Sequence, residues 1–367
     1  MAAAIVVTGD SRYLKVWHGQ TGKCLKTLAG YTNWVAALAI NPDNTIIASA
    51  HLDFSVQLWD IQTGKQLNVL KGHRSGLRAV TFSPDGQTVA SAGDDETIKI
   101  WDVQTGKCLK TFHYVTEQND YQGGIWAITF SPDGRWLASG GQDQTVKIWD
   151  IENGEVWKNL IGHQDFVWTL AFHADAQKTI LASGSDDATI KIWDINQGKC
   201  LTTLIGHQNK VKAIAFNSDG QLLLSGCEDG TSKLWQIETA ECLHTMCGHT
   251  GSVWAVAISH NDQLLFTGSQ DHTIKIWDIG CDQYRQILTE HSDTVTSLAI
   301  TKNDQILISG SFDGTIRLWE LPNYQCQQTI QVTRPYEGMN ITNARLSPGQ
   351  SAVLQVLGAI PLANSLY

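Results

Sequence analysis

A short phrase that ends in tryptophan recurs along the whole chain. Ser183 begins the stretch SGSDDATIKIWDINQGKC, and near-copies begin at Ser91 and Thr267. Successive copies of the closing tryptophan are separated by 42, 42, 48, 44, 42, 42 and 42 residues. A constant period in this range indicates repeated units that stack on one another. The eight tryptophans are Trp17, Trp59, Trp101, Trp149, Trp193, Trp235, Trp277 and Trp319.

The interior of one repeat indicates four short β-strands. The copy that begins at Gly206 contains the apolar runs KVKAIAFNS, LLLSGC, TSKLWQI and CLHTMC, and turn signals such as Asp-Gly separate them. None of these runs has a helical period. A single four-stranded sheet cannot bury both of its faces, so neighbouring sheets have to pack against it. We therefore expect an all-β protein in which the sheets close around an axis as a β-propeller.

Two dipeptides in register with this period connect the chain to a known family. Gly-His recurs at Gly72-His73, Gly162-His163, Gly206-His207 and Gly248-His249, and Asp follows the repeat tryptophan at Asp60, Asp102, Asp150, Asp194 and Asp278. With these motifs, residues 1–331 resemble the WD-repeat β-propeller family. We predict that they form one domain. The remaining residues, 332–367, are expected to form a separate tail.

The resemblance implies a hydrogen-bonded chain of His, Ser or Thr, Asp and Trp inside each blade. Trp donates, Ser and neutral His both donate and accept, and Asp accepts, so these residue types can be joined in series. Tyr31 and Tyr121 stand at the histidine position in two other copies. Five copies carry a full set: His73, Ser91, Asp95 and Trp101; His163, Ser183, Asp187 and Trp193; His207, Ser225, Asp229 and Trp235; His249, Thr267, Asp271 and Trp277; His291, Ser309, Asp313 and Trp319.

The sequence leaves two possible numbers of blades. The first copy lacks its innermost strand, whereas the eighth supplies its own outer strand, QCQQTIQ. We expect eight blades with a thin first blade; the alternative is seven full blades, with the first three strands left over. In the tail, Ser347 followed by Pro348 predicts a short helix. The tail resembles the segment that follows the WD repeats of bacterial, especially cyanobacterial, signal-transducing ATPases, although the chain contains no G-x-x-x-x-G-K-[ST] motif.

Composition limits the classes of partner and compartment. The net charge of −10 argues against a nucleic-acid partner, and no transmembrane or secretory segment is expected. The 8 cysteines have no paired spacing, which favours free thiols in the reducing cytoplasm. We also expect a monomer. A Ser-His-Asp set that recurs five times argues for structure rather than catalysis, so we predict no catalytic site, no cofactor and no metal site.

We predict a non-catalytic platform for protein–protein interaction, which the family resemblance to ATPase sensor modules places in a bacterial signalling system. The alternatives are a small-ligand binder or enzyme in the central channel, and a purely structural scaffold. Three positions in each repeat are expected to point to the face that carries the loops between blades, which we call the top face. Several copies have large side chains at these positions. The repeat does not require them, because other copies have Gly76, Gly124, Ala36 and Thr294 there. The partner should be apolar with some acidic character. The candidate binding residues are Trp34, Leu52, Arg78, Trp126, Phe166, Trp168, Lys210, Lys212, Trp254 and Phe312.

Overall fold

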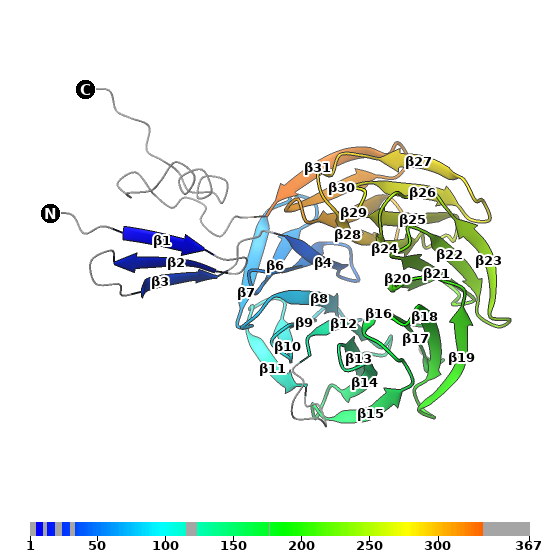
Figure 1. The fold of residues 1–367 in the computed structure, drawn as a ribbon, viewed down its shortest axis with the longest axis horizontal. Helices are drawn as coiled ribbons and strands as arrows, with labels where there is room; N and C mark the ends of the chain where they lie inside the picture. Colours follow the sequence, from blue (N-terminus) through cyan, green and yellow to red (C-terminus); the bar gives the residue numbers. More distant parts are fainter. Residues whose placement is uncertain are drawn as a thin grey trace.

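The chain folds into a ring of seven four-stranded antiparallel sheets around a central channel (Figure 1). The computed structural model describes residues 5–9, 13–18, 24–29, 34–114, 123–175 and 177–332. In each blade the strands run in chain order from the channel to the outer edge. The described residues contain no helix, and therefore none that is long and apolar enough to cross a membrane.

Each blade uses four consecutive strands of one repeat. The first four blades are β4 (Val35–Ile40), β5 (Ile46–His51), β6 (Ser55–Asp60), β7 (Gln66–Lys71); β8 (Leu77–Phe82), β9 (Thr88–Gly93), β10 (Thr97–Asp102), β11 (Cys108–His113); β12 (Ile125–Phe130), β13 (Trp136–Gly141), β14 (Thr145–Asp150), β15 (Val156–Ile161); and β16 (Val167–Phe172), β17 (Ile180–Ser185), β18 (Thr189–Asp194), β19 (Lys199–Ile205). The last three are β20 (Val211–Phe216), β21 (Leu222–Cys227), β22 (Ser232–Gln236), β23 (Glu241–Met246); β24 (Val253–Ile258), β25 (Leu264–Ser269), β26 (Ile274–Asp278), β27 (Tyr284–Leu288); and β28 (Val295–Ile300), β29 (Ile306–Ser311), β30 (Thr315–Glu320), β31 (Gln325–Gln331).

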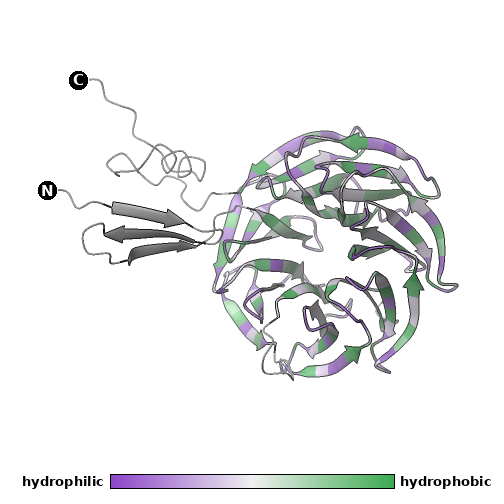
Figure 2. Cartoon of the chain, in the orientation of Figure 1, coloured by the Kyte–Doolittle hydropathy of each residue, from purple (hydrophilic) through white to green (hydrophobic). Residues whose placement is uncertain are grey.

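The core lies between blades. Each hydrophobic cluster joins residues of two neighbouring sheets, as where Leu58 and Leu70 of one blade pack with Leu77 and Trp101 of the next. The repeat tryptophans of the seven blades, from Trp59 to Trp319, are buried in these clusters. The outer strands alternate hydrophilic and hydrophobic residues along their length, because only one of their faces is covered (Figure 2). Every blade thus depends on both of its neighbours for burial of its apolar surface.

The prediction of eight blades is wrong, and the alternative with seven full blades is correct. The inner strand β28 packs directly against β4, which closes the ring. At this seam the Thr296 hydroxyl donates to the carbonyl of Val35 at 2.6 Å, and the backbone N–H of Lys302 donates to the Asn44 side chain at 3.1 Å. The first copy forms a separate three-stranded sheet, β1 (Ile5–Gly9), β2 (Tyr13–His18) and β3 (Cys24–Ala29). Its described strands include no inner strand, and inner strands carry the contacts between blades.

The strand that ends the last repeat, β31, stops at Gln331, where the sequence placed the end of the propeller. The helix predicted from Ser347 lies outside the described residues, as does the tail from residue 333 onward. The helix and the separate tail domain remain predictions.

Removal of residues 1–33 should leave the propeller folded. The seam between β4 and β28 closes the ring without them, so a truncated chain that begins at Trp34 should unfold cooperatively with little change in melting temperature. Scanning calorimetry of the full and truncated chains measures this directly. Loss of cooperative unfolding on truncation would show that the first copy belongs to the ring.

Candidate functional site

A tryptophan–hydroxyl hydrogen bond is present in all seven blades. In the blade of β16–β19, Trp193 and Ser183 lie diagonally on adjacent strands and on the same face, because Ser183 pairs with Lys191, two residues before the tryptophan. The indole N–H donates to the hydroxyl at 2.7–2.9 Å throughout the ring. The pairs are Trp59 with Ser49, Trp101 with Ser91, Trp149 with Ser139, Trp193 with Ser183, Trp235 with Ser225, Trp277 with Thr267 and Trp319 with Ser309.

Four blades extend this bond to a complete chain. His163 Nδ1 lies 2.8 Å from Asp187, and its Nε2 lies 2.7 Å from the Ser183 hydroxyl. An ionised carboxylate only accepts, so Nδ1–H donates to Asp187 and Ser183 donates to Nε2. Desolvation raises the pKa of the equivalent Asp95, but bonds from His73 and the backbone lower it by more, to about 2. The other complete chains contain His73 with Asp95, His249 with Asp271 and His291 with Asp313.

In two blades, part of the network is made by residues that the sequence did not single out. In the blade of β4–β7, His51 on strand β5 lies 2.7 Å from the Ser49 hydroxyl and 3.2 Å from the carbonyl of Trp34. In the blade of β12–β15, the buried Tyr114 hydroxyl donates to Asp143 at 2.8 Å. Tyr31 and Tyr121, the predicted occupants of these positions, lie outside the described residues.

The fifth predicted set is incomplete. His207 Nε2 lies 2.6 Å from Ser225, but its Nδ1 has no hydrogen-bond partner, and the carboxylate of Asp229 instead accepts from Thr231. The prediction of five complete chains is therefore wrong by one. The serines of all these chains are fully buried, as Ser183 is, and they already accept the tryptophan N–H, so they cannot act as nucleophiles toward a bound substrate.

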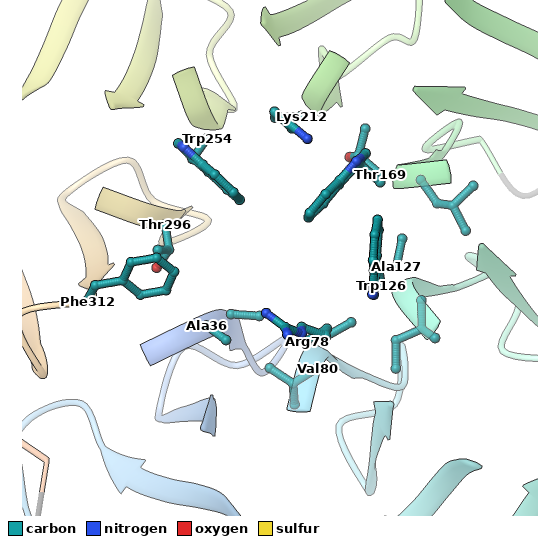
Figure 3. A pocket seen from close by; sticks show the side chains of 15 residues that line it. Ala36, Arg78, Val80, Trp126, Ala127, Thr169, Lys212, Trp254, Thr296 and Phe312 are labelled. Atoms are coloured by element: carbon teal, nitrogen blue, oxygen red, sulfur yellow. The ribbon is translucent and has the colours of Figure 1, made fainter. Parts of the chain in front are cut away.

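A β-bulge at the start of every inner strand directs one side chain into the channel. The pairing register skips one residue there, for example Trp168 between Val167 and Thr169. Bulges re-aim side chains and are common at functional sites. All seven bulge residues line one cavity of about 220 Å³ (Figure 3): Ala36, Arg78, Trp126, Trp168, Lys212, Trp254 and Thr296.

Four aromatic rings contribute to the wall of this cavity, which we call the channel mouth. Trp126 and Trp168 are in contact with ring centroids 4.1 Å apart, and Trp168 and Trp254 meet edge to face at 5.7 Å. Phe312 lies 6.4 Å from Trp254 and stacks on Trp34 at 4.4 Å across the seam. The rings are half-buried and therefore retain exposed surface. The channel mouth thus combines aromatic rings with polar side chains such as Arg78, Lys212 and Thr296.

The basic residues of the channel mouth are paired with acids. Lys212 is buried, lies 3.0 Å from Asp186 and stands 3.6 Å over the ring of Trp168. Desolvation lowers the pKa of Lys212, and the bond to Asp186 opposes this shift. Lys210 also contacts Asp186, at 2.9 Å, and Arg78 contacts Asp94 at 2.9 Å. Arg78 and Asp94 form a one-to-one pair, whereas two lysines share Asp186, so most of this positive charge is compensated and one net charge is left.

The comparisons with known proteins agree with the repeat and the blade geometry. A family model described as the WDR3 second beta-propeller domain matches residues 1–279, and a second, described as WD domain, G-beta repeat, matches residues 282–320. The chain belongs to the WD-repeat β-propeller family. The nuclear distribution protein PAC1 of Mycosarcoma maydis is 40% identical over 50 residues, which cover 13% of this chain and 11% of that protein.

The matches to known proteins do not include bacterial signal-transducing ATPases, which the tail resembles in sequence. The matches cover the repeats, and the tail lies beyond residue 320, where the second family model ends. That resemblance remains a prediction based on the tail sequence.

Six of the ten predicted binding residues line the cavity, and the other four lie outside it. Trp34 and Phe166 pack on the rings of the channel mouth, Lys210 stands on Asp186, and Leu52 lies apart, near Gly76. The residues that line the cavity itself are Arg78, Trp126, Trp168, Lys212, Trp254 and Phe312.

Sequence reasoning missed Asp94 and Asp186, which neutralise the basic side chains. A signal was available, because both stand just before the turn aspartate, at the same repeat position as Leu52 and Phe312. Acids at this position are the expected partners of a basic residue on the adjacent inner strand.

Proposed function

We propose that this propeller binds a protein partner at the channel mouth by accepting an apolar side chain into the cavity. Binding of protein partners is general in WD-repeat propellers. The observation that supports this site is that three of the seven inner strands have tryptophan at the bulge position. Ala36 and Thr296 occupy the same backbone position as Trp126, Trp168 and Trp254, so the fold does not require tryptophan there. Half-buried tryptophans gathered around a cavity are typical interface hot spots.

The size and polarity of the cavity favour a side chain over a cofactor. Pockets for small molecules usually have volumes of about 300–1,000 Å³, and this cavity has about 220 Å³. The indole N–H groups of Trp126, Trp168 and Trp254 have no acceptor among the described residues. The ion pairs of Lys212 and Arg78 favour a partner selected for apolar surface rather than for acidity.

Affinity selection of peptides from a displayed library on the wild-type chain tests the proposal. Peptides selected on the wild-type chain should share a large apolar side chain. They should not bind a variant with Trp126→Ala and Trp168→Ala, and they should bind a variant altered on the outer strand at Trp157, whose side chain is 38% exposed. Selected peptides that bind all three proteins equally would place the interaction elsewhere.

The two alternative functions have distinct outcomes. A small-ligand binder or enzyme would yield no peptide that depends on the channel mouth but would show turnover or saturable binding in small-molecule screens. A purely structural scaffold would yield neither. A role in bacterial signalling, a cytoplasmic location, a monomeric state and the absence of nucleic-acid, membrane and cofactor binding remain predictions.

A further inference from the structure

The blade of β20–β23 has an unusual histidine. His207 is 6% exposed, its Nε2 is bonded to Ser225, and its Nδ1 is buried without a partner. In the four blades with complete chains, an aspartate lies 2.8–2.9 Å from the equivalent nitrogen. A buried polar atom without a partner is costly, by about 1–3 kcal/mol, and native structures contain few of them. This blade therefore retains a ring nitrogen that is available to a ligand.

A cysteine distinguishes this blade from its neighbours. Cys227 stands two residues after the network serine, where other blades have Ser185, Ser269 and Ser311. Those hydroxyls accept the backbone N–H of the turn aspartate, as Ser185 does from Asp187 at 3.1 Å. The Cys227 thiol donates to the carbonyl of Asn209 at 3.1 Å. Asp229, two residues further on, is exposed.

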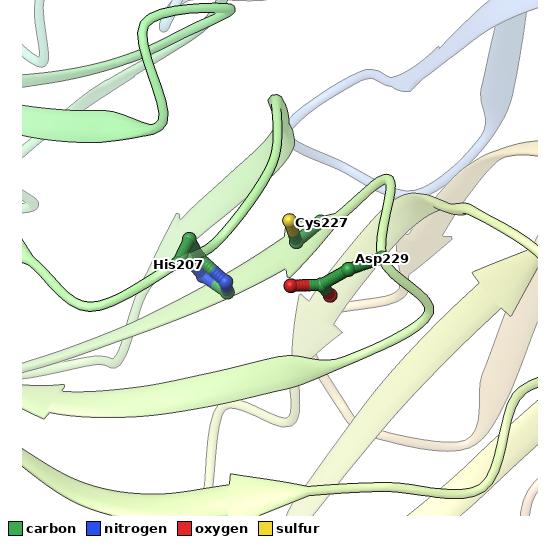
Figure 4. Close-up of side chains that lie close together, drawn as sticks. All are labelled: His207, Cys227 and Asp229. Carbon is green, nitrogen blue, oxygen red and sulfur yellow. The ribbon is translucent and has the colours of Figure 1, made fainter.

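The result is a group of three potential metal ligands. The ligand atoms of His207, Cys227 and Asp229 all lie within 4.8 Å of one another. In Figure 4 the imidazole of His207 and the carboxylate of Asp229 face each other, with the Cys227 side chain beside them. A set with one imidazole, one thiolate and one carboxylate is suited to Zn²⁺. We propose that His207, Cys227 and Asp229 form a zinc site, with its fourth position open to water on the exposed side of Asp229.

The site needs only a small adjustment to hold the ion. Tetrahedral zinc with bonds of about 2.0–2.3 Å places its ligand atoms about 3.4–3.6 Å apart. Asp229 is exposed and its side chain can rotate, so it can move toward the two buried ligands by about an ångström. The backbone N–H and the hydroxyl of Thr231 both donate to one carboxylate oxygen of Asp229 and leave the other free.

The surrounding hydrogen bonds permit the required tautomer of His207. Coordination through Nδ1 requires the proton on Nε2, which then donates to the Ser225 hydroxyl at 2.6 Å. Ser225 can in turn donate to the carbonyl of Lys233 at 3.3 Å, while it still accepts from Trp235. Such bonds orient metal-ligating histidines. Binding replaces the thiol proton of Cys227, which leaves to solvent, and no electron is transferred.

Metal binding to the full chain tests the site. After treatment with a chelator, the wild-type protein should bind one equivalent of Zn²⁺ that a Cys227→Ser variant does not bind, measured by equilibrium dialysis. Co²⁺ in place of Zn²⁺ should give a thiolate-to-metal absorption band in the wild type and none in Cys227→Ser. Zn²⁺ should also raise the melting temperature of the wild type and not that of the variant. The matched control is Cys242→Ser, which removes an exposed thiol from the same blade and should behave as the wild type.

Cys227→Ser introduces the residue found in three other blades, so it should fold. Asp229→Asn provides a second variant, on an exposed side chain, and should weaken zinc binding at least tenfold. The proposal is overturned if the wild type binds no zinc. It is also overturned if Cys227→Ser binds as much as the wild type, since exposed cysteines would then hold the metal.

Discussion

Replacement of Trp126 and Trp168 together by alanine should lower the affinity for a peptide bound at the channel mouth by at least about a hundredfold. Loss of a central interface tryptophan typically costs about 2 kcal/mol or more, and every 1.4 kcal/mol is about tenfold in affinity. The fold should survive, because both rings are half-buried and the bulge position accepts alanine in the first blade, at Ala36.

The measurement is a titration of a labelled peptide, together with a melting curve of each protein. Trp157→Ala is the matched control, since it removes a partly exposed tryptophan from the outer strand β15. It should bind as the wild type does. The account fails if the double variant binds with unchanged affinity. If the double variant unfolds instead, the two tryptophan side chains are needed for the stability of the propeller. Trp254→Ala then becomes the test of binding.

Asp187→Ala should lower the free energy of unfolding by about 1–3 kcal/mol. The substitution leaves Nδ1–H of the buried His163 unpaired and removes the acceptor of the backbone N–H groups of Gln164 and Thr189. Each buried donor without a partner costs free energy on this scale. Urea denaturation of the wild type and the variant gives the difference.

Asp229→Ala is the control for this measurement. It occupies the same repeat position, but it is exposed and makes no bond to His207, so its loss should destabilise the chain much less. The comparison requires a chelator, so that zinc cannot stabilise the wild type. Equal losses in the two variants would show that the histidine–aspartate bond is not what stabilises the blade.

Most of the fold was predictable because it depends on local pattern. Apolar runs separated by Asp-Gly turns predict the strands, and a fixed offset of ten residues between Ser183 and Trp193 predicts their bond. The number of blades was not predictable in this way. A count of tryptophans counts repeats, whereas closure depends on which inner strands meet, and β28 meets β4.

The candidate site, too, was predictable only in part. The repeat positions of Trp126, Trp168 and Trp254 could be found by alignment of the copies, and the structure brings these residues to one cavity. That each of them is a bulge residue depends on strand register, which a sequence does not display. The break between His207 and Asp229 was also hidden, because both residues stand at the usual spacing. Only the neighbouring Cys227 indicates it.

A crystal structure of the chain with a selected peptide is the most direct test of binding at the channel mouth. We expect an apolar side chain of the peptide in the cavity, in contact with Trp126 and Trp168. A peptide bound instead along the outer strands, with the rings of the channel mouth unchanged, would contradict it.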